Sequence, residues 1–170
     1  MTGKKRMWFP GASYHITARG NRRNDIFKDE EDFELYYFNG KCTRIISEYG
    51  KQVTKDITNY LIQEGNVILS GLSKGIESIA HTVTIKNNGR TMAFLPCGID
   101  YVYPKEHKSL INMISDFGVL LSQYQPGDKI KKSYFRERSK RIIEWSDEVI
   151  LVEAWENSTV LTSIEYAHKI

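Results

Sequence analysis

Short apolar runs alternate with amphipathic stretches from about residue 41 to the C-terminus. The apolar runs predict strands, and the stretches with apolar residues at helical spacing predict helices. The predicted strands are 67–69, 91–95, 119–122 and 148–154. The predicted helices are 47–65, 75–86, 108–117, 136–145 and 159–170. Strands that alternate with helices indicate βαβ units, and therefore an α/β fold with a mostly parallel sheet between two helical layers.

The first 37 residues follow another pattern. Residues 14–19 alternate in a way that predicts a strand, and residues 29–38 predict a short acid-led helix with Asp29 near its N-cap. Basic residues and no acids occur before Asn24. This basic strand and small helix could contact phosphates, or could be a solvated basic arm. We therefore expect two units, a small strand-helix appendage over 1–37 and the main domain over 38–170.

The composition indicates the cellular compartment but does not indicate a particular function. The net charge of +3 permits nucleic acid as a partner but does not argue for it. Cys42 and Cys97 have no metal-ligand spacing with the histidines, so both are expected to be reduced in a cytoplasmic protein. No apolar run approaches the ~18 residues of a membrane span. No long apolar segment follows the basic start, so we expect no secretory signal.

Candidate chemistry gathers at the carboxyl ends of the predicted strands, where parallel α/β folds bind ligands. Ser70 and Gly71 form a tight turn after the first apolar run, and Gly75 opens the next helix. Such a turn could offer backbone amides to phosphate, although close helix–strand packing explains the same glycines. Arg44 precedes a helix and Lys105 follows a proline, and each could equally be a solvated surface cation.

Residues 129–141 are strongly basic and include the adjacent aromatics Tyr134 and Phe135. Aromatic faces stack on unpaired bases while cations hold the backbone, although a solvated basic helix face has the same composition. Together these features predict a site for single-stranded DNA. Its candidate residues are Arg44, Ser70, Gly71, Lys74, Gly75, Gly98, Lys105, Arg138, Lys140 and Arg141.

No catalytic constellation is evident in the sequence. Ser122 has no partnered histidine, and Glu77, Asp100 and Glu153 are isolated acids. Neither a Walker lysine motif nor a Gly-x-Gly-x-x-Gly motif is present. We therefore expect no enzymatic activity, no metal and no cofactor.

Residues 7–27 closely resemble the opening of the REP-associated tyrosine transposases. That family cleaves DNA with a tyrosine on a later helix and a metal held by a His-hydrophobe-His pair. The later histidines, His81, His107 and His168, form no such pair. We therefore expect no transposase chemistry.

The main domain resembles the DprA/Smf DNA-processing family. Five segments carry the family's motifs in order: 42–44 with 49–50, 70–77 with His81, 98–105, 138–142, and 152–154 before 157–162. The resemblance implies a Rossmann-like fold that binds single-stranded DNA and hands it to RecA in natural transformation. It gives Arg44 and Lys105 the main DNA contacts, gives the 70–75 and 98 turns backbone donors, and makes RecA and a second copy of the chain candidate partners.

Some positions depart from the family pattern. The family's first strand should precede Thr43, where only 36–38 could stand in, in poor register. Cys42 replaces a glycine, and the chain stops at Ile170, before the family's next strand. We therefore expect a junction between a transposase start and a truncated DprA core. Two alternatives stay open: a nucleotide-binding sensor or hydrolase on a related fold, and an inactive chimera.

Overall fold

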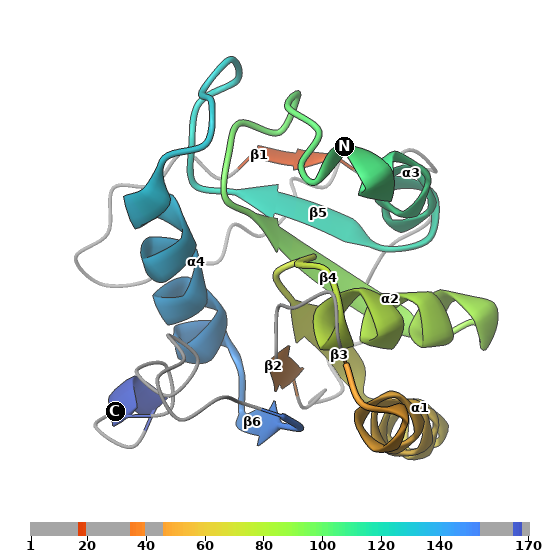
Figure 1. The fold of residues 1–170 in the computed structure, drawn as a ribbon. Coiled ribbons are helices and arrows are strands. Elements are labelled where there is room, and N and C mark those ends of the chain that lie inside the picture. Colours follow the sequence, from red (N-terminus) through yellow and green to blue (C-terminus); the bar gives the residue numbers. More distant parts are fainter. Residues whose placement is uncertain (1–16, 20–34, 40–45, 154–164, 168–170) are drawn as a thin grey trace, which may run out of the picture.

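The computed structural model describes residues 17–19, 35–39, 46–153 and 165–167. Its elements form a layered α/β domain with one mixed sheet (Figure 1). The strands are β1 (Thr17–Arg19), β2 (Leu35–Asn39), β3 (Val67–Ser70), β4 (Arg90–Leu95), β5 (Val119–Ser122) and β6 (Glu148–Leu151). The helices are α1 (Glu48–Gln63), α2 (Ile76–Lys86), the 3-10 turn η1 (Lys105–His107), α3 (Lys108–Phe117) and α4 (Lys132–Trp145). The predicted fold class is confirmed.

The sheet has six strands in the order β1-β5-β4-β3-β2-β6. All neighbouring pairs are parallel except β1 and β5, which run antiparallel. Side chains alternate across β3: Val67 and Leu69 pack toward α4, whereas Ile68 packs toward α1 and α2. Figure 1 shows α1, α2 and α3 on one side of the sheet and α4 on the other. This is the three-layer arrangement that the alternating pattern predicts.

The strand β2 corrects three expectations about the N-terminal region. Residues 35–38 were expected to end a short helix, but they are part of a strand; residues 29–34 lie outside the described part of the chain. Leu35 pairs with Val67 of β3, and Tyr36 pairs with Glu148 of β6, so β2 is an internal strand of the sheet. Residues 36–38 do stand in for the strand expected before Thr43, and they pair in continuous register rather than in a poor one. Aromatic residues favour strands, and here that preference outweighs the acidic start. The expected boundary after residue 37 falls within β2.

Most other boundaries agree with the sequence. The helix α4 begins at Lys132 rather than at residue 136 because Lys131 is extended and its carbonyl accepts the amide of Tyr134. Lysines are unfavourable at a helix N-terminus, which is why the sequence favoured a later start. The strand β6 ends at Leu151, three residues earlier than expected. Of the helix expected over 159–170, only 165–167 is described, and these residues are helical.

Candidate nucleic-acid interface

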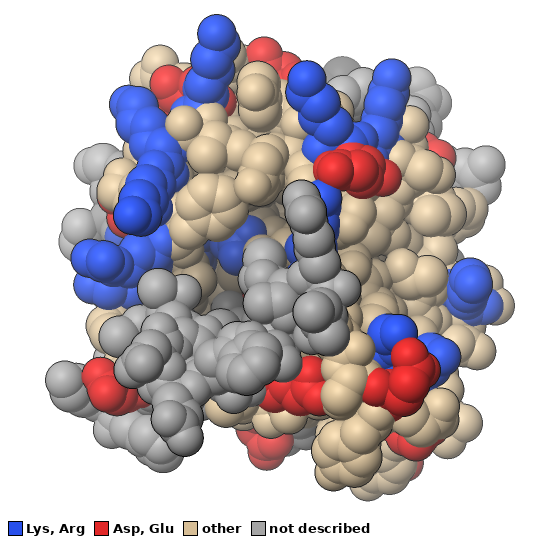
Figure 2. All heavy atoms as spheres, viewed as in Figure 1, with Lys and Arg blue, Asp and Glu red and all other residues tan. Residues whose placement is uncertain are grey.

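The strands β3, β4 and β5 end at one edge of the sheet. The loops that follow them, 71–75, 96–104 and 123–131, lie beside the start of α4 (Figure 1). Figure 2 shows lysine and arginine side chains on both sides of a largely uncharged hollow, over the start of α4 on one side and, beside an acidic side chain, over the η1–α3 region on the other. We call this region the carboxyl edge. It has the charge that a polyanion requires.

A buried ion pair lies beneath the β3–α2 loop. Arg138 Nη2 is 3.6 Å from Glu77 Oε2, and each side chain is 5% exposed. Arg138 also donates to the carbonyl of Gly71 and, at 3.2 Å, to Ser73 Oγ, while Glu77 accepts the amide of Ser73 at 2.7 Å. The pair therefore joins α4 to the loop. A Cβ at Gly71 would lie 2.3 Å from Arg138 Cζ, so close packing explains this glycine.

This arrangement changes the role expected for Arg138. The sequence suggested a DNA contact, but its guanidinium is buried and already donates to the loop. A signal for this position was present: Arg138, Ile142 and Trp145 recur at helical spacing on the inward face of α4. Arg138 is a positioning residue for the β3–α2 loop rather than an exposed cation.

The expected cradle of backbone amides is largely used within the protein. The amide of Gly75 donates to Ser78 Oγ at 3.2 Å, and that of Gly98 donates to the carbonyl of Asp128 at 2.9 Å. Ser70 and Gly71 are buried. Gly75 has a φ of 105°, which explains glycine there. A Cβ at Gly98 would lie 2.4 Å from the carbonyl of Gln125. These glycines therefore determine the shape of the loops. Because these amides donate within the protein, side-chain cations are the groups that remain available to bind phosphate.

The turn η1 is fixed to the β3–α2 loop by two contacts. His107 Nδ1 donates to the carbonyl of Leu72 at 3.0 Å, and Lys74 Nζ lies 2.7 Å from Glu106 Oε1. The hydrogen bond from Lys74 lowers the pKa of Glu106, so this pair is charged at neutral pH. Lys105, at the start of η1, is exposed. The structure therefore holds Lys105 next to the loop that the sequence selected.

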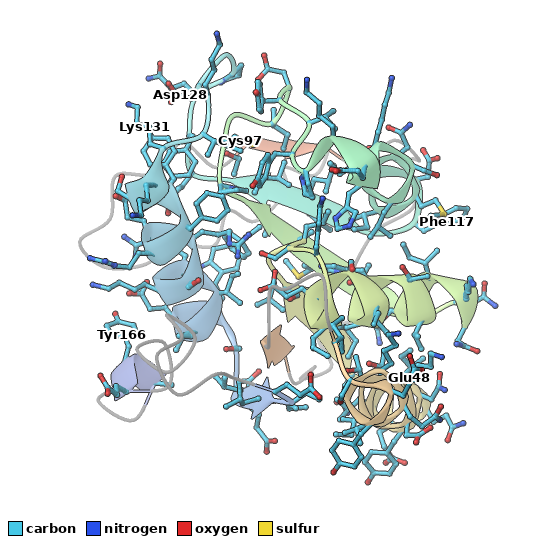
Figure 3. The ribbon with its side chains drawn as sticks, viewed as in Figure 1. Glu48, Cys97, Phe117, Asp128, Lys131 and Tyr166 are labelled. Atoms are coloured by element: carbon cyan, nitrogen blue, oxygen red, sulfur yellow. The ribbon has the colours of Figure 1, made fainter. Side chains whose placement is uncertain are left out.

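The structure separates Lys140 and Arg141 from these loops. Lys140 Nζ lies 5.2 Å from the ring centroid of Tyr166, and Arg141 pairs with Glu144. Figure 3 places Tyr166 beside the far end of α4, whereas Lys131 lies at its start. Arg44 lies outside the described residues, so its expected place beside Lys105 stays a prediction.

Glu153 has a contact that the sequence did not reveal. Its carboxylate accepts the hydroxyl of Ser47, the N-cap of α1, and lies 3.4 Å from the amide of Ser47. A Cβ at Gly50 would lie 2.5 Å from Glu153 Cδ, so glycine allows this approach. Glu153, which looked isolated in the sequence, therefore ties the chain after β6 to the start of α1.

Cys97 is a packing residue. Burial raises the pKa of its thiol to about 11, and Sγ donates to the carbonyl of Tyr101 at 3.3 Å. A protonated, buried thiol is a poor nucleophile. Over the described residues, no group of three or more His, Cys, Asp and Glu side chains is placed to hold a metal. The helices in the same ranges are too short or too polar to cross a membrane.

Three relatives illustrate the comparisons with known proteins. Protein Smf from Synechocystis sp. is 35% identical over 127 residues, which cover 75% of this chain and 32% of the Smf sequence. The crystal structure of DNA processing protein A from Streptococcus pneumoniae matches with a TM-score of 0.79 and 31% identity over 91% of this chain and 51% of that one. The structure of DNA processing protein A from Helicobacter pylori, which concerns the single-stranded DNA binding mode of that protein, matches with a TM-score of 0.75 and 27% identity over 92% of this chain and 77% of that one.

The match with the family covers most of this chain but only part of the length of its relatives. The chain spans about a third of the length of the first curated relatives, 32% of the Synechocystis protein and 39% of the Bacillus subtilis DprA. The match to the family model for DNA recombination-mediator protein A covers residues 42–170, and the resemblance of residues 1–37 to transposases stays a prediction. The chain belongs to the DNA recombination-mediator protein A family, which includes the DprA and Smf proteins.

Proposed function

We propose that this chain binds single-stranded DNA along the carboxyl edge of its sheet. The observation that carries the proposal is the placement of Lys105, which is exposed on a turn that two contacts fix to the β3–α2 loop. The exposed cations Lys131 and Lys132 lie at the start of α4, where Figure 3 labels Lys131. The Helicobacter pylori relative, a single-stranded DNA binder, supports the same ligand.

Two kinds of contact hold the strand in this proposal. Phosphates meet Lys105 and Arg44, with Lys74, Lys131 and Lys132 adding charge around the hollow. Because cations on a polynucleotide release counterions, binding weakens as salt increases. Unpaired bases are free to stack on aromatic rings, and paired bases are not. The site therefore favours single strands over duplexes.

The wider role is part of the same proposal. In the cell, the chain would receive single strands in the cytoplasm during natural transformation and deliver them to RecA, acting as a homodimer without enzymatic activity of its own. Residues 1–37 would be a transposase-derived segment, and the motif residues at 42–44, 70–77 and 98–105 support the DprA part of this role.

Fluorescence anisotropy of a labelled oligothymidylate tests the ligand. We expect saturable binding that unlabelled single strands compete away and that a duplex of the same length competes away poorly. Equal competition by the duplex would contradict the proposal. Incubation of the same preparation with nucleotides serves as a second readout, and turnover there would favour a hydrolase.

A further inference from the structure

Among the described residues, five aromatic rings lie at the carboxyl edge: Tyr101 packs against the core, and three of the others are engaged on their faces. Tyr134 is stacked on Tyr124, with ring centroids 3.7 Å apart and an angle of 15° between the ring planes. Lys131 Nζ lies 5.0 Å from the centroid of Tyr134. The guanidinium of Arg138 lies over Phe135, 5.6 Å from its centroid. The adjacent aromatics that the sequence selected for base stacking are therefore already occupied.

Tyr103 is the ring that differs. It contacts Phe135 edge-on, with centroids 5.7 Å apart and an angle of 73°, and the residue is 38% exposed. Over the residues that the structure describes, its hydroxyl has no hydrogen-bond partner. Since the residue is more than a third exposed, part of the Tyr103 ring reaches solvent beside its contact with Phe135.

The position of Tyr103 is fixed before any ligand binds. Pro104 is buried directly after it, and η1 follows, held to the β3–α2 loop by His107 and by Lys74 with Glu106. Phe135 supports the ring from α4. A ring held in place loses little entropy when it stacks on a ligand, which strengthens binding.

We propose that Tyr103 stacks on an unpaired base of the bound strand, with Phe135 and Arg138 supporting it from behind. This inference rests on the proposed function and adds the residue that contacts a base. Lys105 lies two residues further along the chain, and Lys131 and Lys132 lie at the start of α4, about one turn before Phe135, so cations that can meet phosphates come from both segments that hold the ring.

An abasic strand keeps the phosphates but lacks the bases, so it distinguishes phosphate contacts from base stacking. Affinities are measured for oligothymidylate and for an abasic strand of equal length, with wild type, Tyr103→Phe, Tyr103→Leu and Tyr103→Ala. Loss of the ring should weaken binding of oligothymidylate by roughly 5- to 100-fold and leave binding of the abasic strand unchanged. Tyr103→Phe keeps the ring and should bind both strands like the wild type.

Tyr103→Leu keeps an apolar contact with Phe135, so it separates stacking from folding. A fluorescent purine analogue in the strand should be quenched by the wild type and by Tyr103→Phe, but not by Tyr103→Leu. The matched control is Tyr60→Ala, which removes an exposed tyrosine of α1 and should change neither affinity. Equal losses on both strands, or no loss on either, would overturn the role of Tyr103. A wild type that binds neither strand would instead overturn the proposed function.

Discussion

The guanidinium of Arg138 and the carboxylate of Glu77 face each other beneath the β3–α2 loop, with Nη2 and Oε2 3.6 Å apart and both side chains 5% exposed. Arg138 comes from the helix between β5 and β6, whereas Glu77 lies in the first turn of α2. Their hydrogen bonds to Gly71 and Ser73 connect both helices to one loop. The loop beside the proposed DNA site is therefore held from below by buried charge.

Removal of one partner of this pair should strongly destabilise the folded protein. Arg138→Ala leaves Glu77 buried without its counter-charge, which typically costs about 3–5 kcal/mol. Urea unfolding should show this loss as a lower midpoint with an unchanged slope. Arg136→Ala, which removes an exposed cation from the same helix, is the matched control and should change stability by no more than about 0.5 kcal/mol. A loss no larger than that of the control would contradict the structural role of Arg138.

Substitution of Gly71 should act through the same arginine. The added Cβ of Gly71→Ala would lie 2.3 Å from Arg138 Cζ, so the guanidinium must move and its loop hydrogen bonds weaken. Overpacking of this kind typically costs about 1–3 kcal/mol. Because the clash needs the guanidinium, the cost of Gly71→Ala should be much smaller in an Arg138→Ala background. Thermal unfolding of the two single variants and the double variant measures this coupling, and additive losses would contradict it.

The buried histidine of α2 makes stability depend on pH. His81 Nδ1 lies 2.6 Å from Thr91 Oγ1, whose hydroxyl donates to the carbonyl of Ile68 at 2.8 Å, so His81 carries its proton on Nδ1. Burial lowers the pKa of His81 from 6.5 to about 3. The folded state therefore keeps His81 neutral, while the unfolded chain binds a proton below its own pKa.

Because only the unfolded chain binds this proton readily, acid favours the unfolded state. Stability from His81 is fully present above the unfolded pKa of 6.5 and is lost as pH falls from 6.5 toward 3. The free energy of unfolding should fall by up to about 1.4 kcal/mol per pH unit from this group. His81→Gln cannot take up the proton, so its stability should vary less between these limits. Urea titrations across this range test the prediction, and parallel pH profiles for the two proteins would refute it.

Glu106 should oppose DNA binding. It is exposed, pairs with Lys74 and adds a negative charge next to Lys105. Glu106→Gln removes that repulsion while the His107 hydrogen bond to Leu72 still holds η1, so it should strengthen binding of oligothymidylate severalfold at low salt and less at high salt. Glu48→Gln breaks a comparable exposed pair with Lys51 on α1 and serves as the control. Unchanged or weaker binding by Glu106→Gln would count against Lys74 as a phosphate contact.

The helices and strands of the three layers could be predicted because the pattern of apolar residues that defines each of them is local in the sequence. The apolar run before Ser70 and the spacing of Leu110, Ile111 and Ile114 define elements whose burial follows from a few neighbouring residues. The strand β2 was harder because its acidic lead-in suggests a helix, and only pairing with β3 and β6 makes it a strand.

The site was predicted in part. Lys105 begins η1, which contacts the β3–α2 loop, and its contact with DNA stays a prediction. The amide of Gly98 was expected to be free, but its acceptor is the carbonyl of Asp128, which is far away in sequence. Arg138 looked like one more cation in a basic segment until packing placed it under the loop. Local patterns do not show contacts between distant loops.

The salt dependence of single-strand binding tests the central claim most directly. The logarithm of the affinity for oligothymidylate is plotted against the logarithm of salt concentration for the wild type, for Arg44→Ala with Lys105→Ala, and for the control Lys55→Ala with Lys86→Ala. Loss of two phosphate contacts should lower affinity and reduce the slope by about 1.4, since each contact on a single strand contributes about 0.7. The control pair, exposed lysines of α1 and α2, should match the wild type. Unchanged affinity and slope in the Arg44→Ala, Lys105→Ala variant would contradict the account.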